Sequence, residues 1–249
     1  SSTWNSGSWQ TASIMGPAVG GLLYAFSGIT ACFVVIVIFL ALALGCIIFF
    51  VKNYPAYFVP KENIFKSLSE GIRFVFKSRM ILGALSLDMF SVFFGGAVAL
   101  MPIFAHDILK VGAEGLGFMR AAPALGAVIT MFILAKYPPM NKPWRNLLLA
   151  VAGFGISIIC FGLSRNFYLT LLCLFFEGAF DSVSVIIRST ILQILTPEEM
   201  RGRVSAVNGI FINSSNEIGA FESGATARLM GTIPSVIFGG SITIMIVIF

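Results

Sequence analysis

The residues of this chain that could do chemistry are a few ionisable side chains inside long apolar stretches. Asp88 lies about nine residues into an apolar run that begins near residue 79. A lone carboxylate at such a depth costs about 3 kcal/mol or more if it is charged and faces lipid. We therefore expect it to face the protein interior, to hold a proton or to pair with a cation. It then either couples proton or substrate movement, or forms a static hydrogen bond to a neighbouring helix.

A second polar group lies within one later apolar stretch. Glu177, Asp181, Ser184 and Arg188 are spaced by four, three and four residues, so they share one face if the stretch is helical. Two acids four residues apart repel each other when both are ionised, so one of them can hold a proton. The group either forms an ion-pair network that closes the cytoplasmic end or contacts a substrate directly.

The segment 204–228 is too polar to face lipid on all sides. Asn213, Asn216 and Glu217 lie close together near its middle. We expect these side chains to line a cavity. Polar packing against other helices, helped by small residues in the same segment, is the alternative.

Arg120 and His106 allow less specific interpretations. Arg120 lies near the predicted outer third of its helix, where it either extends to the membrane interface or pairs with Asp88 or an anionic substrate. His106 is the only histidine and stands beside Asp107. Without a second histidine or an acid cluster at ligand spacing, we expect no metal site.

Familiar enzyme motifs are missing from the sequence. It contains no H-E-x-x-H, no G-x-S-x-G and no Cys–His pairing, so we expect no catalytic residue and no enzymatic activity. We also expect no cofactor. Since no ATP-binding motif is present either, any energy source on this chain is an ion gradient or the gradient of a transported substrate.

The composition explains why these residues stand out. The chain is 57% hydrophobic and 11% charged, whereas soluble domains average about 25% charged residues. Apolar stretches of this length predict an all-α, polytopic membrane protein with about eight transmembrane helices. The predicted helices are 9–27, 30–51, 79–104, 113–135, 145–163, 167–194, 204–228 and 232–249. The net charge of +5 comes mostly from loops, so we expect no nucleic-acid partner.

Basic loops alternate with loops that hold few charges. Lys and Arg concentrate at 52–79, at 136–145 and at 201–203, which places these three loops in the cytoplasm. The longest loop contains apolar residues at helical spacing between 63 and 76, so we expect an amphipathic helix on the membrane surface. Its apolar residues are Ile64, Phe65, Leu68, Ile72 and Phe76.

Three stretches resemble the major facilitator superfamily. Gly7 to Gly21 is similar to the antiporter motif of its fifth helix, and the core G-P-x2-G-G falls on Gly16, Pro17, Gly20 and Gly21. The upstream half of that motif is matched less well. The stretches 86–127 and 196–211, the latter continued by 216–224, resemble the enterobactin-exporter-like branch around helices seven and eight and between helices ten and eleven.

The resemblance implies a domain organisation. Residues 1–51 would be helices five and six, at the end of an N-terminal six-helix bundle, and residues 52–78 a cytoplasmic linker. Residues 79–249 would be the C-terminal six-helix bundle, so this chain would hold eight of twelve helices. The two bundles would rock about a central cavity. The glycines four apart in the antiporter motif would allow close helix packing.

The resemblance also implies roles for particular residues. Arg201, Gly202 and Arg203 would form a latch between the bundles, whereas the sequence alone suggests a role in topology and headgroup contact. The protein would be a monomeric secondary transporter of the bacterial inner membrane, exporting a siderophore, drug or similar amphipathic small molecule against proton entry. Candidate coupling acids are Asp88, Glu177, Asp181 and Glu217. An importer or uniporter on the same fold, or a non-transporting scaffold, is the alternative.

Overall fold

The computed structural model describes residues 2–50, 64–137 and 139–248, and most of these residues are helical. The long helices are α1 (Ser2–Phe50), α2 (Ile64–Lys77), α3 (Arg79–Phe94), α5 (Gly112–Lys136), α6 (Pro143–Leu163), α7 (Phe167–Leu195), α8 (Arg201–Met230) and α9 (Thr232–Ile248). A 3-10 turn, η3 (Glu198–Met200), precedes α8. The described residues contain no strand, and the predicted all-α class is confirmed.

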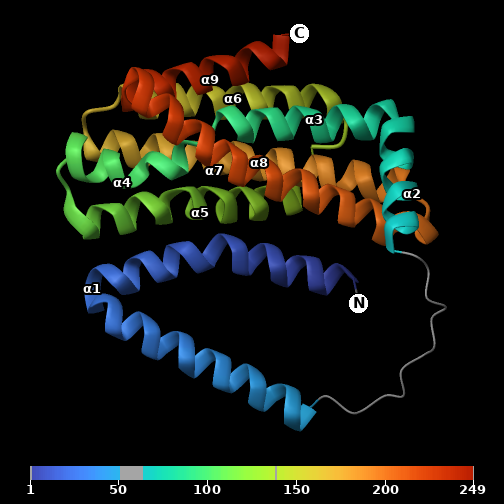
Figure 1. The fold of residues 1–249 in the computed structure, drawn as a ribbon, viewed down its shortest axis with the longest axis horizontal. Helices are drawn as coiled ribbons and strands as arrows, with labels where there is room; N and C mark the ends of the chain where they lie inside the picture. The colour runs from blue at the N-terminus through green and yellow to red at the C-terminus, as the bar shows by residue number, and fades with distance from the viewer. Residues whose placement is uncertain (1, 51–63, 138, 249) are drawn as a thin grey trace.

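Helix α1 is two helices joined at a sharp turn. Gly28 adopts φ 76° and ψ 178°, a conformation that glycine reaches without steric cost. The two predicted segments 9–27 and 30–51 correspond to the two arms on either side of this turn. Figure 1 shows the first arm along α5, with which α1 makes contact, while the second arm diverges from the bundle.

The predicted helix 79–104 is interrupted rather than continuous. Helix α3 ends at Phe94 and is followed by η1 (Ala97–Leu100), α4 (Met101–Ile103) and the π-turn η2 (Phe104–Ile108). The break falls at Gly95 and Gly96, because glycine has a low helix propensity and both positions are tightly packed. A Cβ atom on Gly96 would lie 3.1 Å from the Ser223 hydroxyl of α8.

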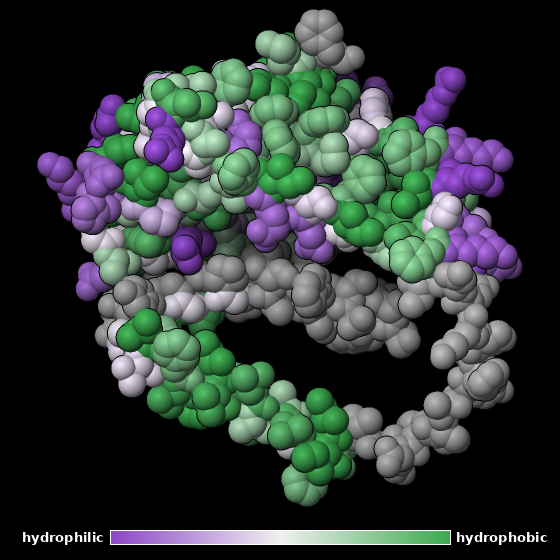
Figure 2. Space-filling model, viewed as in Figure 1, coloured by the Kyte–Doolittle hydropathy of each residue, from purple (hydrophilic) through white to green (hydrophobic). Residues whose placement is uncertain are grey.

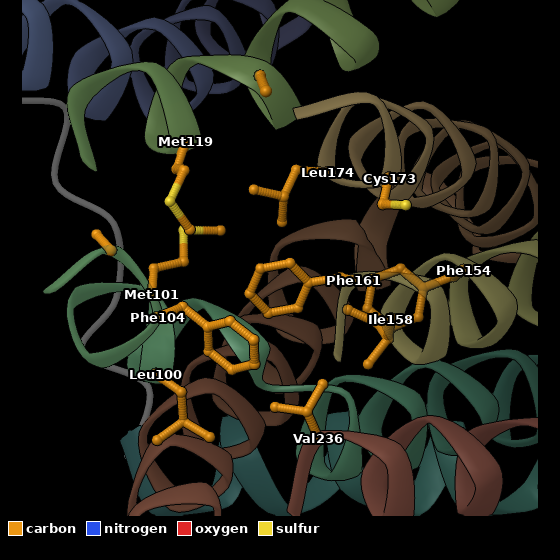
Figure 3. Close-up of a cluster of buried hydrophobic side chains, with 12 residues drawn as sticks. Leu100, Met101, Phe104, Met119, Phe154, Ile158, Phe161, Cys173, Leu174 and Val236 are labelled. Carbon is orange, nitrogen blue, oxygen red and sulfur yellow. The ribbon is translucent and has the colours of Figure 1, made fainter. Parts of the chain in front are cut away.

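The largest core cluster joins the broken end of α3 to α5, α6, α7 and α9. The rings of Phe104 and Phe161 lie 4.4 Å apart between centroids, and Figure 3 shows Leu174, Met119 and Val236 around them. These side chains are nearly inaccessible to solvent, so they fix α5, α6 and α7 as one packed unit. That unit positions the polar residues of α7.

Apolar surface covers the middle of the molecule. Five stretches among the described residues are long and apolar enough to cross a membrane: 27–50, 79–108, 112–136, 143–163 and 167–195. Helix α9 is apolar but shorter, and α8 is long but more polar. Figure 2 shows hydrophilic residues gathered mainly at the two ends of the bundle. Large apolar side chains on the second arm of α1 are widely exposed, as lipid-facing residues are.

Helices α5 and α7 approach each other at two glycines. A Cβ atom on Gly126 would collide with the Phe175 carbonyl, and one on Gly178 with the Pro123 carbonyl. Backbone cannot move aside as a side-chain end can, so either Gly126→Ala or Gly178→Ala is expected to cost about 1–3 kcal/mol of stability. Gly224→Ala, where an added Cβ meets no atom within 4 Å, is the matched control.

Thermal denaturation of the purified full-length protein in detergent measures this difference. Both buried variants should melt well below wild type, whereas the control should match or exceed it because alanine favours a helix interior. Equal melting temperatures for all three variants would show that α5 and α7 do not meet at these glycines.

Candidate functional site

The centre of the site is an ion pair between two helices. The Arg188 guanidinium of α7 contacts the Asp88 carboxylate of α3. Both residues are buried, with 5% and 6% of their surface exposed. The pair places opposite charges together in the apolar interior, where each charge alone would be strongly disfavoured.

Sequence reasoning did not predict this partner. It offered Arg120 as a cation for Asp88, but Arg120 is exposed on α5 and the Asp88 carboxylate is paired with Arg188. The pairing of Arg120 with Asp88 is therefore wrong, and extension of Arg120 to the surface fits its exposure. Asp88 and Arg188 lie in different helices far apart in sequence, so no periodic signal links them.

A small pocket opens beside the ion pair, between α3, α6 and α7. Its lining comprises Asp88, Ser91, Val92, Val151, Phe154, Asp181 and Ser184. Ser91 donates to the Leu87 carbonyl at 2.5 Å, which leaves its oxygen lone pairs available. The Ser184 hydroxyl is buried and has no hydrogen-bond partner in the described part of the chain. The pocket therefore combines hydrogen-bonding groups with an apolar wall.

Glu177 extends the polar face of α7 one turn further. It is buried, and its Oε2 atom has no hydrogen-bond partner among the residues that the structure describes. Asp181, four residues on, is half-buried. On the neighbouring side of the helix, the Ser182 hydroxyl donates to the Ala127 carbonyl of α5 at 3.3 Å. This contact fixes the rotation of α7, so the face that sequence spacing predicted for these residues does point inward.

The charges of this site do not cancel. Asp88 and Arg188 neutralise each other, whereas no Lys, Arg or His among the described residues forms an ion pair with Glu177 or Asp181. An unpaired carboxyl in an apolar interior is more stable when it is neutral. Glu177 and Asp181 therefore lie near the Asp88–Arg188 pair as two further carboxyl groups without a counter-charge in the described part of the chain.

Comparisons with known proteins identify the family of this chain. A family model of the major facilitator superfamily, described as transmembrane secretion effector, matches residues 2–249. The chain belongs to this family. Its relatives include the proteins named enterobactin exporter EntS from Escherichia coli O1:K1 / APEC and from Shigella boydii serotype 18 (strain CDC 3083-94 / BS512). Each is 29% identical over 234 residues, which cover 91% of this chain and 54% of the relative.

This membership confirms the resemblance seen in the sequence and the polytopic helical membrane fold. The chain spans about half the length of the curated relatives it matches. Membership of this superfamily makes the chain part of an integral membrane protein. The apolar surface of the bundle and its buried charges are consistent with that class.

The polar residues of α8 divide between two faces. Ser215, Gly219 and Ser223 are buried, and a Cβ atom on Gly219 would lie 2.8 Å from the Phe93 carbonyl of α3. In contrast, Asn213, Asn216 and Glu217 are exposed. Figure 2 shows hydrophilic atoms over the middle of α8. Packing of small residues against α3 therefore describes one face of this helix, whereas the cavity-lining role of Asn213, Asn216 and Glu217 on the exposed face stays a prediction.

Arg203 pairs with the linker helix. Its guanidinium lies 2.5 Å from the Glu70 carboxylate of α2, and Arg201 lies 3.5 Å from Glu198. Gly71 is buried beneath the Arg203 backbone, where an added Cβ would lie 2.9 Å from the carbonyl oxygen. Gly202 is open. The sequence analysis named Arg203 but not Glu70. An acidic residue on the amphipathic linker helix could have been predicted to pair with the basic loop.

The glycines of the antiporter motif lie in the first arm of α1. At Gly16 and at Gly20 an added Cβ would meet no atom within 4 Å. Among the described residues, nothing therefore provides the close packing that the spacing of these two glycines predicts. Pro17 and Gly21 belong to the same helix.

No metal centre is evident in the described part of the chain, where no three His, Cys, Asp or Glu side chains converge. The exposed His106 ring lies 2.5 Å from the Asp107 carboxylate, its neighbour in sequence.

Proposed function

We propose that this protein is a proton-coupled exporter of a siderophore, drug or similar amphipathic small molecule. The observation that carries the proposal is the buried Asp88–Arg188 pair beside a pocket that also receives Asp181 and Ser184. Such charges are costly in a membrane interior and are typical of ion and substrate pathways. The family match and the name enterobactin exporter of the relatives support export and this class of cargo.

The proposed domain organisation follows the superfamily. Residues 1–51 form the end of an N-terminal bundle, residues 52–78 a cytoplasmic linker, and residues 79–249 the C-terminal bundle. The protein acts as a monomer in the bacterial inner membrane. In support, the basic loops at α2, between α5 and α6, and before α8 lie at one end of the bundle (Figure 1), as cytoplasmic loops do.

The proposed coupling uses the ion pair as a tie between α3 and α7. While Asp88 is charged, Arg188 holds the two helices together. A proton that reaches Asp88, through Asp181 and the hydroxyl groups of the pocket, breaks the pair and frees both helices to move. Release of the proton to the cytoplasm restores the tie, so one cycle moves a proton inward and a substrate outward.

Efflux from proteoliposomes that hold the full-length protein tests this function. A panel of siderophores and amphipathic drugs is loaded, and their loss is followed with and without an imposed pH gradient. We expect one class of compound to leave faster with the gradient. Transport at the same rate with and without the gradient would contradict proton coupling and favour a uniporter. If no compound of the panel is transported, a scaffold role is favoured.

A further inference from the structure

Helix α2 presents three different stripes around its circumference. Leu68, Gly71 and Val75 recur every three or four residues and face inward. Val75 is fully buried and packs in one cluster with Val204 of α8. The Glu70–Arg203 pair and the close approach at Gly71 hold α2 against the same helix, so α2 is a fixed part of the bundle.

A second stripe is apolar and exposed. Phe65, Ile72 and Phe76 are 82%, 40% and 58% exposed, and Met80 at the start of α3 continues the line at 52%. Spaced by seven and four residues, the three lie on one side of the helix, next to the docked face. Figure 1 shows α2 running across the end of the bundle, transverse to the membrane-spanning helices. A helix in that position lies along the membrane surface.

The third stripe is basic. Lys66, Arg73 and Lys77 are exposed and each follows one residue after a member of the apolar stripe. One residue is about 100° of helix rotation, so the basic stripe lies beside the apolar one and away from the bundle. Glu70, the acid of α2 in the described part of the chain, is paired with Arg203 and so does not neutralise this stripe.

We propose that α2 binds the anionic phospholipids of the leaflet it lies on, with its apolar stripe among the acyl chains and its basic stripe at the headgroups. An apolar stripe bordered by cations is the arrangement that matches a negatively charged bilayer surface. Because α2 is fixed to α8 and α3, lipid bound there stabilises that end of the bundle. This inference rests on the membrane fold and not on transport.

The test is a melting experiment on the purified full-length protein in detergent, with phosphatidylglycerol, phosphatidylcholine or glycerol 3-phosphate added. The melting temperature of the wild type should rise most when phosphatidylglycerol is added. A Lys66→Gln/Arg73→Gln/Lys77→Gln variant should lose that preference, with the half-saturating concentration raised about fivefold per charge, or about a hundredfold in all. A matched control, Lys136→Gln/Lys142→Gln/Arg145→Gln, removes three other exposed cations at the same end and should keep it.

Two further variants separate the parts of the interaction. Lys66→Arg/Lys77→Arg keeps the charges and should behave as wild type. Ile72→Ser/Phe76→Ser should weaken stabilisation by both lipids alike. If the triple glutamine variant keeps its preference for phosphatidylglycerol, or if glycerol 3-phosphate stabilises as well as the lipid does, the proposal is wrong. If the triple variant does not fold, the single variant Lys66→Gln tests the proposal. It should raise the half-saturating concentration of phosphatidylglycerol about fivefold.

Discussion

Asp88→Asn is expected to destabilise the protein by about 3–5 kcal/mol, because it leaves the Arg188 guanidinium buried without its partner. A guanidinium does not give up its proton in a protein, so the unpaired charge persists at every accessible pH. Arg188→Gln should cost less, since the abandoned Asp88 carboxyl can take up a proton and become neutral. Its cost should shrink as pH falls, because protonation removes the unpaired charge.

Thermal denaturation of both variants in detergent, between about pH 5 and about pH 8, measures the asymmetry. Arg201→Gln provides a control, because it removes an exposed ion pair with Glu198 that should contribute about 1 kcal/mol or less. In the double variant Asp88→Asn/Arg188→Gln the loss should be smaller than the sum of the single losses. Additive losses, or an Asp88→Asn variant as stable as wild type, would show that the two side chains do not depend on each other.

Hydropathy and local capping place most of the helices. The junction between α6 and α7 shows why: α6 ends at Leu163, and the Asn166 side chain accepts hydrogen bonds from the backbone N–H groups of Tyr168 and Leu169 at 2.9 and 3.3 Å. Asparagine before an apolar run is a strong start signal for a helix. Sequence and structure therefore agree closely on this boundary.

Tertiary contacts decide what hydropathy leaves open. The stretch from Arg79 to Ile108 is apolar enough to be one helix, yet it breaks at Gly95 and Gly96 where neighbouring helices approach. Hydropathy averaged over a window of residues does not show which glycine contacts another helix. The same limit applies to Gly16 and Gly20, whose spacing predicts close packing that the described residues do not provide.

Part of the candidate site could be predicted from the sequence. The shared face of Glu177, Asp181 and Arg188 follows from helical periodicity alone, and the structure places it inward. The partner of Asp88 does not follow from periodicity, because α3 and α7 are brought together by the tertiary fold and not by any local sequence pattern. Burial also had to come from the structure, since it separates Glu177, whose Oε2 atom is enclosed, from the exposed Glu217.

Asp181→Asn is expected to abolish the gradient dependence of efflux, lowering it to the rate measured without a pH gradient. Asp181 lines the pocket beside the ion pair, and an amide of the same shape cannot take up a proton. Exchange of labelled for unlabelled substrate across the membrane needs no net proton movement, so it should survive. Glu177→Gln should have the weaker effect of the two, because Glu177 does not line the pocket.

Paired efflux and exchange assays on proteoliposomes of the full-length variants measure both quantities. Glu114→Gln, which removes an exposed acid in the first turn of α5, is the matched control and should transport as wild type. Loss of exchange as well as efflux in Asp181→Asn would assign Asp181 to substrate contact. Efflux that still follows the gradient in Asp181→Asn would remove it from the proton pathway, and would leave Asp88 as the acid to examine beside Arg188.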